Sequence, residues 1–325
     1  MLPSLSNLIN LKQYLKRYSK YQPAAFEYLV ASAFSQIFHL PFQSKDNEDN
    51  TVNHRVIWYG SVNKKSKTIS KSPSGPDSIC FAYGFYVLIE STLRDGANQW
   101  RKEFIESLKH YDDFVGAKNA DRKDVYLILT TRKLHKDTFT GFQQKVKEGY
   151  NIILLETSFL AKIGNIAHAV FTVKHSDLRQ LFNAIVKVLR ESTSFGKFRG
   201  NLNQGISEWQ KDVHKAGKMT FIGVKSYEAI CKAVYQKGRA NLSVGEIFRR
   251  LLKDPIVKDY FEIIDDKPLI SYIEQSLVDQ GLGVVVGESS QTEPLFEPVH
   301  SADFKGRGLR LIKTVEGING KLQCK

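Results

Sequence analysis

The chain has 325 residues, of which 42% are hydrophobic and 25% are charged. These proportions exclude a disordered chain, a collagen-like fibre and a coiled-coil rod, and the length favours two domains. Lys and Arg number 47 against 34 Asp and Glu, which gives a formal net charge of +13. Such a charge attracts polyanions and makes nucleic acid the first partner to test, although in many basic proteins it serves solubility alone.

The three cysteines, Cys80, Cys231 and Cys324, lie far apart and form no C-x-x-C pair. Their spacing predicts neither a disulfide framework nor a zinc site, and it fits a reducing compartment. The N-terminus lacks the features of a secretory signal, and no apolar run approaches the length of a membrane span. We therefore expect a soluble, cytoplasmic protein without a membrane partner.

In the first 40 residues, apolar side chains recur three and four positions apart, between 8 and 18 and again between 26 and 37. This period predicts two helices. From Ser44 to Ser74 the sequence is polar, with one short apolar run, Val56–Tyr59, and the lysines Lys64, Lys65, Lys67 and Lys71 after it. We expect a basic surface loop that contains one short strand.

Strand and helix patterns alternate in the next segment. We expect strands at 77–82 and 85–93, a helix at 98–114, a strand at 125–130, a helix at 138–148, a strand at 152–155 and a helix at 177–191. This alternation predicts an α/β layer fold with a mixed sheet flanked by helices.

Residues 192–206 are rich in Ser, Gly and Asn and show no period, which predicts a linker. It would separate an N-terminal domain, residues 1–195, from a C-terminal domain, residues 205–325. The patterns beyond it predict helices at 207–216, 226–237, 244–253 and 268–280, followed by short strands at 282–286, 295–299 and 309–312. Ser243 and Glu246 form a capping box at the start of one helix. Helices followed by a β-hairpin are the order of a winged helix.

The most informative segment is the pair of apolar runs that flank Tyr83-Gly84. If these two residues form the turn of a hairpin, Asp77 lies opposite Glu90. Directly opposed residues have Cβ atoms about 4.5–5.5 Å apart, and two like charges there repel unless a cation lies between them.

Two alternatives remain for these acids: Asp77 as an ordinary turn residue after Pro76, and Glu90 as a solvent-facing strand residue. The run Phe85–Ile89 is apolar on both alternating faces, which is typical of a buried central strand and disfavours the second alternative. Carboxylate oxygens are the ligands that Mg²⁺ prefers, so the pair predicts a magnesium site.

Pro76-Asp77, twelve intervening residues and then Glu90-Ser91-Thr92 at the end of an apolar strand resemble the PD-(D/E)xK nuclease superfamily, in particular type II restriction endonucleases. The resemblance covers about residues 20–160. It implies a restriction-endonuclease-like fold in which Asp77 and Glu90 bind Mg²⁺, with Glu27 on the preceding helix as a further acidic member.

One position departs from the family pattern, because Thr92 stands where the superfamily usually has lysine. The run Glu90-Ser-Thr-Leu-Arg-Asp-Gly-Ala-Asn-Gln99 looks like a variant of the motif found in some restriction enzymes. In that variant Gln99 or Glu103 would enter the catalytic site with Asp77, Glu90 and Thr92, and Arg94 or Lys102 would replace the lysine.

Other residues carry weaker signals. The histidines, among them His54, His110, His135 and His214, lack metal-ligand spacing and are interpreted as surface or structural residues. No phosphate-binding glycine motif occurs, so no nucleotide cofactor is expected. Residues predicted to contact DNA are basic or lie on the predicted C-terminal recognition helix: Lys64, Lys65, Lys67, Arg94, Lys102, Lys267, Tyr272, Gln275, Lys305, Arg307 and Arg310.

The leading hypothesis is a Mg²⁺-dependent type II restriction enzyme, a site-specific deoxyribonuclease that cleaves double-stranded DNA. Its N-terminal domain would be catalytic and its C-terminal domain would recognise sequence. Cleavage of both DNA strands at a palindromic site, with one catalytic site in each chain, would favour a homodimer with two-fold symmetry. The alternatives are a DNA-binding protein with an inactive nuclease fold and a nuclease of repair or transposition.

Overall fold

The computed structural model describes residues 2–18, 21–63, 68–71, 75–169, 173–237, 241–253, 257, 273, 275–277, 283–288 and 294–298. The chain divides into two compact units. The N-terminal unit comprises Met1–Ala169 and Val173–Gln210, and the C-terminal unit comprises Val170–Thr172 and Lys211–Lys325. Within the described residues, no helix has the length and apolar character that a membrane span requires.

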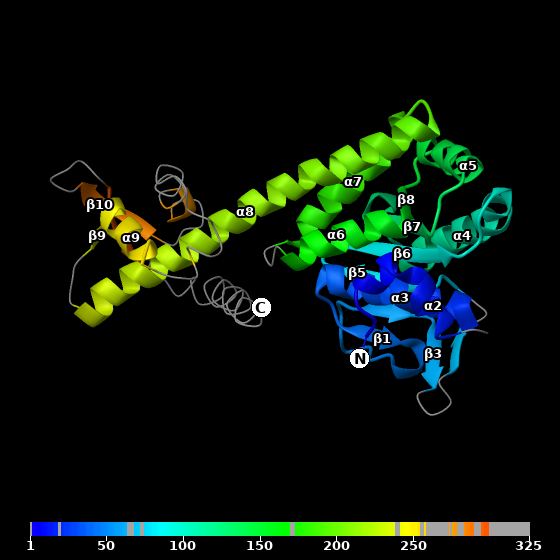
Figure 1. Cartoon of the computed structure of the whole chain (residues 1–325), viewed down its shortest axis with the longest axis horizontal. Coiled ribbons are helices and arrows are strands. Elements are labelled where there is room, and N and C mark those ends of the chain that lie inside the picture. Colours follow the sequence, from blue (N-terminus) through cyan, green and yellow to red (C-terminus); the bar gives the residue numbers. More distant parts are fainter. Residues whose placement is uncertain are drawn as a thin grey trace. The chain divides into compact units, whose positions relative to one another are not determined.

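A six-stranded mixed sheet forms the centre of the N-terminal unit, in the order β1-β2-β5-β6-β7-β8 (Figure 1). The strand β1 runs parallel to β2, the strands β2, β5 and β6 are antiparallel, and β6, β7 and β8 are parallel. The predicted mixed sheet is therefore confirmed. The bounds are β1 (Phe42–Ser44), β2 (Val56–Trp58), β5 (Ser78–Ala82), β6 (Phe85–Thr92), β7 (Val125–Thr131) and β8 (Ile152–Glu156).

Helices flank this sheet, as the sequence predicts. Their bounds are α1 (Ser6–Ile9), α2 (Leu11–Lys16), α3 (Gln22–Phe38), α4 (Ala97–Lys118), α5 (Lys136–Lys147), α6 (Thr157–Ala169) and α7 (His175–Glu191). Side chains on β6 meet different helices in alternation. The Phe85 ring lies 5.9 Å from Phe38 of α3, whereas the Tyr86 ring lies 5.4 Å from Phe114 of α4. Because side chains of a strand alternate between the two faces, Glu90 shares the α4 face with Tyr86.

Two strands form where the sequence predicts a surface loop. The antiparallel strands β3 (Gly60–Asn63) and β4 (Thr68–Lys71) pair Val62 with Ile69, and Ile69 is buried. A Cβ atom at Gly60 would lie 2.3 Å from the Trp58 ring, so only glycine permits this close approach. The loop prediction is wrong here because a polar composition does not prevent two short strands from pairing.

Helix α6 is absent from the sequence-based expectation. Its buried side chains, Leu160, Ile163 and Ala167, follow the three- and four-residue spacing of a helix, and α6 packs on α3. The helix begins immediately after β8, without a turn residue between the two elements. The missing turn explains why its boundary could not be recognised.

The predicted linker at 192–206 is wrong from Phe195 onward, because helix α8 (Phe195–Lys237) begins there. The helix is continuous and includes both segments predicted as separate helices, 207–216 and 226–237. Phe198, Leu202 and Ile206 recur at four-residue intervals and are buried. Burial of this face stabilises a helix despite the low helix propensity of its glycines.

In the C-terminal unit, β9 (Leu242–Ser243) and α9 (Val244–Leu251) precede the antiparallel pair β10 (Gly283–Glu288) and β11 (Pro294–Pro298). The capping box is confirmed, since Ser243 Oγ accepts from the Glu246 N–H at 3.3 Å and Glu246 Oε2 accepts from the Ser243 N–H at 3.1 Å. The strand order is β10-β11-β9. The predicted pairing of these two strands is confirmed, and β9, before α9, pairs with β11, whereas the winged-helix assignment stays a prediction. The strand predicted at 309–312 lies outside the described residues.

Candidate active site

The β5–β6 hairpin has the register predicted from the sequence. Ala82 pairs with Phe85 across the turn, and Ser78 pairs with Ile89. Gly84 adopts φ 82°, a conformation that glycine adopts without steric cost. Asp77 immediately precedes β5, so continuation of this register brings it opposite Glu90.

Asp77 is buried, with 2% of its surface exposed. Its Oδ2 atom accepts two hydrogen bonds from Ser91, one from the backbone N–H at 2.7 Å and one from Oγ at 3.0 Å. Two donors on one oxygen hold the carboxylate in a fixed orientation. The Ser91 side chain is therefore part of the site, although the sequence-based prediction did not include it.

Glu90 is also buried, and its Oε1 atom lies 2.6 Å from Nδ1 of His110 on α4. The hydrogen bond to Glu90 raises the pKa of His110, and the charges of Glu106 and Asp77 raise it further, against the opposing effect of burial. Both carboxylates thus act on this imidazole. The interpretation of His110 as an ordinary surface or structural residue missed this contact; the available signal was its position one helical turn before Phe114, which faces β6.

Thr92 and Gln99 contact the loops that follow the strands. Thr92 Oγ1 accepts from the Arg94 N–H at 3.1 Å. Gln99 is fully buried: its Nε2 donates to Arg94 O at 3.0 Å and Thr131 Oγ1 at 2.8 Å, and its Oε1 accepts from the His135 N–H at 3.1 Å. The amide therefore connects the loop after β6 to the loop after β7. These contacts show that Gln99 holds the two loops together. A catalytic role for Thr92 or Gln99 stays a prediction.

Glu27 is buried on α3, the helix that packs against the opposite face of β6 from α4. Among the described residues, no group of three or more His, Cys, Asp or Glu side chains is arranged to hold a metal ion. Metal binding by Glu27, Asp77 and Glu90 therefore stays a prediction.

Comparison with known proteins gives one family. Residues 5–160 match the AlwI restriction endonuclease family. A solved structure, the small subunit (R.BspD6I2) of the heterodimeric restriction endonuclease R.BspD6I, is similar with a TM-score of 0.44 and 14% identity. That alignment covers 65% of this chain and 98% of the other. The sequence has no match among curated proteins.

The AlwI-like segment, residues 5–160, contains the hairpin, Asp77, Glu90, Ser91, Gln99 and His110. The resemblance to type II restriction endonucleases noted from the sequence is thereby confirmed. Strands β5 to β8 and helix α4 also lie inside this segment. The match thus covers the elements that position the carboxylate pair.

The other predicted site residues have different outcomes. Arg94 is exposed in the loop after β6, and Gln275 is exposed and helical. Glu103 and Lys102 belong to α4, but their side chains lie outside the described part. The remaining predicted DNA contacts lie outside the described residues: Lys64, Lys65, Lys67, Lys267, Tyr272, Lys305, Arg307 and Arg310.

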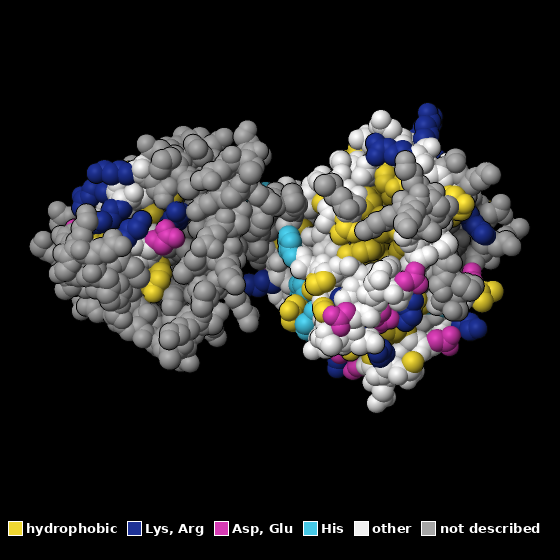
Figure 2. Space-filling model, turned by 90° about the horizontal axis from the view of Figure 1, so that it is seen from below, with side chains coloured by type: hydrophobic (Ala, Val, Ile, Leu, Met, Phe, Trp, Pro, Cys, Tyr) yellow, Lys and Arg dark blue, Asp and Glu magenta, His cyan; other side chains and the backbone are white. Residues whose placement is uncertain are grey.

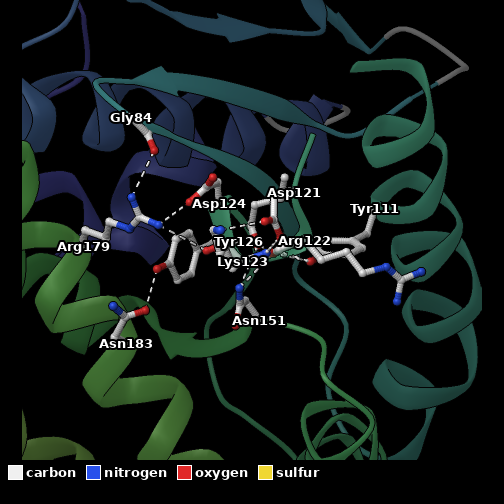
Figure 3. Close-up of polar contacts among 11 residues, drawn as sticks. Gly84, Tyr111, Asp121, Arg122, Lys123, Asp124, Tyr126, Asn151, Arg179 and Asn183 are labelled. Atoms are coloured by element: carbon white, nitrogen blue, oxygen red, sulfur yellow. Dashed lines mark hydrogen bonds and ion pairs between the residues drawn. The ribbon is translucent and has the colours of Figure 1, made fainter. Parts of the chain in front are cut away.

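The turn end of the hairpin carries a different polar network, shown in Figure 3. Arg179 of α7 donates to Gly84 O and forms an ion pair with Asp124, and Tyr126 OH donates to Asn183 Oδ1. These contacts attach α7 to the sheet. A cavity of about 720 Å³ lies beside the turn, but its lining does not include Asp77 or Glu90. Because Phe85 and Glu90 are five positions apart along β6, this end lies roughly 15–20 Å from the carboxylate pair.

Proposed function

We propose that the protein is a metal-dependent endonuclease that hydrolyses phosphodiester bonds in double-stranded DNA at a specific sequence, as a type II restriction enzyme does. The observation that carries this proposal is the buried pair Asp77 and Glu90, brought together at the open end of the β5–β6 hairpin inside the AlwI-like segment.

The donor set fits a divalent cation. Two carboxylates with little solvent exposure on neighbouring strands need a compensating positive charge, and carboxylate oxygens are hard ligands of the kind Mg²⁺ prefers. Asp77 and Glu90 would hold the ion. When bound, Mg²⁺ supplies activation of water and neutralisation of charge on the phosphate oxygens.

The neighbouring residues would orient this pair and the DNA. Ser91 holds the Asp77 carboxylate, and Thr92 accepts from the Arg94 N–H. Thr92 cannot supply the charge of the lysine that usually occupies its motif position. The exposed guanidinium of Arg94, two residues away, would instead contribute positive charge beside the substrate phosphate.

DNA recognition is assigned to the C-terminal unit. Figure 2 shows several basic side chains close together on the described part of this unit. Arg249 and Arg250 lie in the last turn of α9, and the exposed Lys253 follows. Basic groups of this kind contact phosphates, and they extend the set predicted from the sequence. A homodimer would place two catalytic sites on the two DNA strands, and analytical ultracentrifugation with and without DNA tests this stoichiometry.

The deciding experiment measures cleavage of supercoiled plasmid in Mg²⁺ by wild type, Asp77→Asn and Glu90→Gln. Both substitutions keep the side-chain shape and remove the charge. A matched control is Asp112→Asn, which removes an exposed carboxylate from α4 that pairs with Arg122. We expect discrete fragments from wild type and the control, and a rate at least about 100-fold lower for the two site variants.

Cleavage that survives both site substitutions would contradict the site assignment. If the wild-type protein binds DNA but does not cleave it, whichever divalent metal is added, the result would favour a DNA-binding protein with an inactive nuclease fold. The threonine at the position of the usual lysine supports this alternative. A smear in place of fragments would favour a nuclease without sequence specificity.

A further inference from the structure

We propose that His110 is a positioning residue, which orients the Glu90 carboxylate so that it can bind a divalent cation. The inference rests on the proposed function. It concerns a residue 20 positions away from Glu90 that no motif includes, and it gives helix α4 a role in the site.

The geometry of the contact is direct. Glu90 Oε1 and His110 Nδ1 are 2.6 Å apart, with side-chain exposures of 7% for Glu90 and 18% for His110. Glu90 points to α4 because it shares a strand face with Tyr86, which packs on Phe114. His110 lies one helical turn before Phe114 and so presents its ring toward the same strand face.

The two carboxylates are oriented in different ways. Asp77 receives its donors from Ser91, the residue after Glu90, so the hairpin itself fixes that carboxylate. Glu90 receives the described donor from a side chain on a separate helix. The His110 contact therefore acts on the Glu90 carboxylate from outside the sheet, and it can be removed without a change in the hairpin.

Hydrogen bonds to a ligating group from the surrounding protein fix the orientation of that group, and their loss typically lowers metal affinity by about 10- to 100-fold. The competing explanation is an ion pair that stabilises the fold without affecting metal binding. A direct role of His110 as a metal ligand is disfavoured, because no group of three metal-ligating side chains occurs among the described residues.

The test is a titration of the full-length protein with Mn²⁺, with free Mn²⁺ followed by electron paramagnetic resonance. The variants are His110→Ala, His110→Phe and His110→Asn. Phenylalanine keeps most of the ring volume without a donor, whereas the asparagine Nδ2 occupies the position of the histidine Nδ1 and keeps one. Lys109→Ala, an exposed neighbour on α4, is the control.

We expect Mn²⁺ binding to weaken by about 10- to 100-fold in His110→Ala and His110→Phe, and to stay within about threefold of wild type in His110→Asn and Lys109→Ala. Thermal unfolding without metal identifies any variant that does not fold; if alanine unfolds the protein, the comparison of phenylalanine with asparagine decides.

Wild-type affinity in a folded donor-lacking variant would overturn the role of His110, as would equal losses in the phenylalanine and asparagine variants. The proposed function fails in a different way. If wild type neither binds Mn²⁺ nor cleaves DNA, both proposals fall; if wild type does both and the donor-lacking variants match it, only the role of His110 falls.

Discussion

Ser91 and Asp77 are joined by two hydrogen bonds to one oxygen, from the Ser91 N–H at 2.7 Å and from its Oγ at 3.0 Å. Asp77, from the first half of the motif, is thereby hydrogen-bonded to Ser91, from the second half 14 residues later, at the open end of the hairpin. The middle residue of Glu90-Ser91-Thr92 has a physical role that its position in the sequence does not indicate.

Ser91→Ala removes the Oγ donor and leaves the N–H donor in place. We expect the free energy of unfolding to fall by about 1–2 kcal/mol, because a hydrogen bond to a charged acceptor is lost in a buried site. Urea unfolding measures the change. Ser70→Ala, which removes an exposed Ser61–Ser70 hydrogen bond, serves as a control and should change the free energy of unfolding by less than about 0.5 kcal/mol. Equal effects in the two variants would contradict the interpretation.

Gln99→Leu keeps the approximate volume of a fully buried side chain and removes its amide. The part-buried His135 N–H and Arg94 carbonyl then lose their Gln99 partner, so we expect a loss of about 2–4 kcal/mol in the free energy of unfolding. Gln144→Leu, an exposed position on α5, should change stability by less than about 0.5 kcal/mol. A Gln99→Leu protein as stable as wild type would show that the two loops do not depend on this amide.

The raised pKa of His110 predicts a pH-dependent contribution to stability in the metal-free protein, caused first by its hydrogen bond to Glu90. Because the folded pKa lies above the unfolded value of 6.5, this contribution is fully present below pH 6.5 and is lost as the pH rises through the folded value. Urea unfolding of wild type and His110→Asn in EDTA should show a stability difference that shrinks above pH 6.5. A stability difference between wild type and His110→Asn that grows as the pH rises would contradict a raised pKa of His110.

His175 should behave in the opposite way. Burial lowers its pKa, and its neutral ring accepts from the Tyr83 N–H at 2.9 Å and contacts Phe38 O through Nε2 at 2.9 Å. The folded protein resists protonation of this ring, so stability falls as the pH drops below the unfolded value of 6.5. Relative to His175→Asn, which keeps an acceptor near the Nδ1 position, wild type should lose stability between pH 7 and pH 5. A pH-independent difference would show that the ring does not titrate differently in the two states.

The sequence determined the hairpin, its register and the opposition of Asp77 and Glu90, because a two-residue turn and a period of two leave little freedom in pairing. It also determined the capping box before α9, since that contact spans three residues. The continuous helix α8 could have been recognised from its buried period, but its Gly- and Ser-rich start concealed it.

Only the tertiary structure decided which side chains support the carboxylates. His110, 20 residues beyond Glu90 in the chain, reaches it from α4, and Gln99 contacts Thr131 at the end of β7 and His135 in the loop that follows. The pairing of adjacent strands follows from the geometry of a short stretch of chain. A contact between distant elements depends instead on how those elements pack. The period of the sequence shows which face of an element is apolar, but it does not show which other element packs on that face.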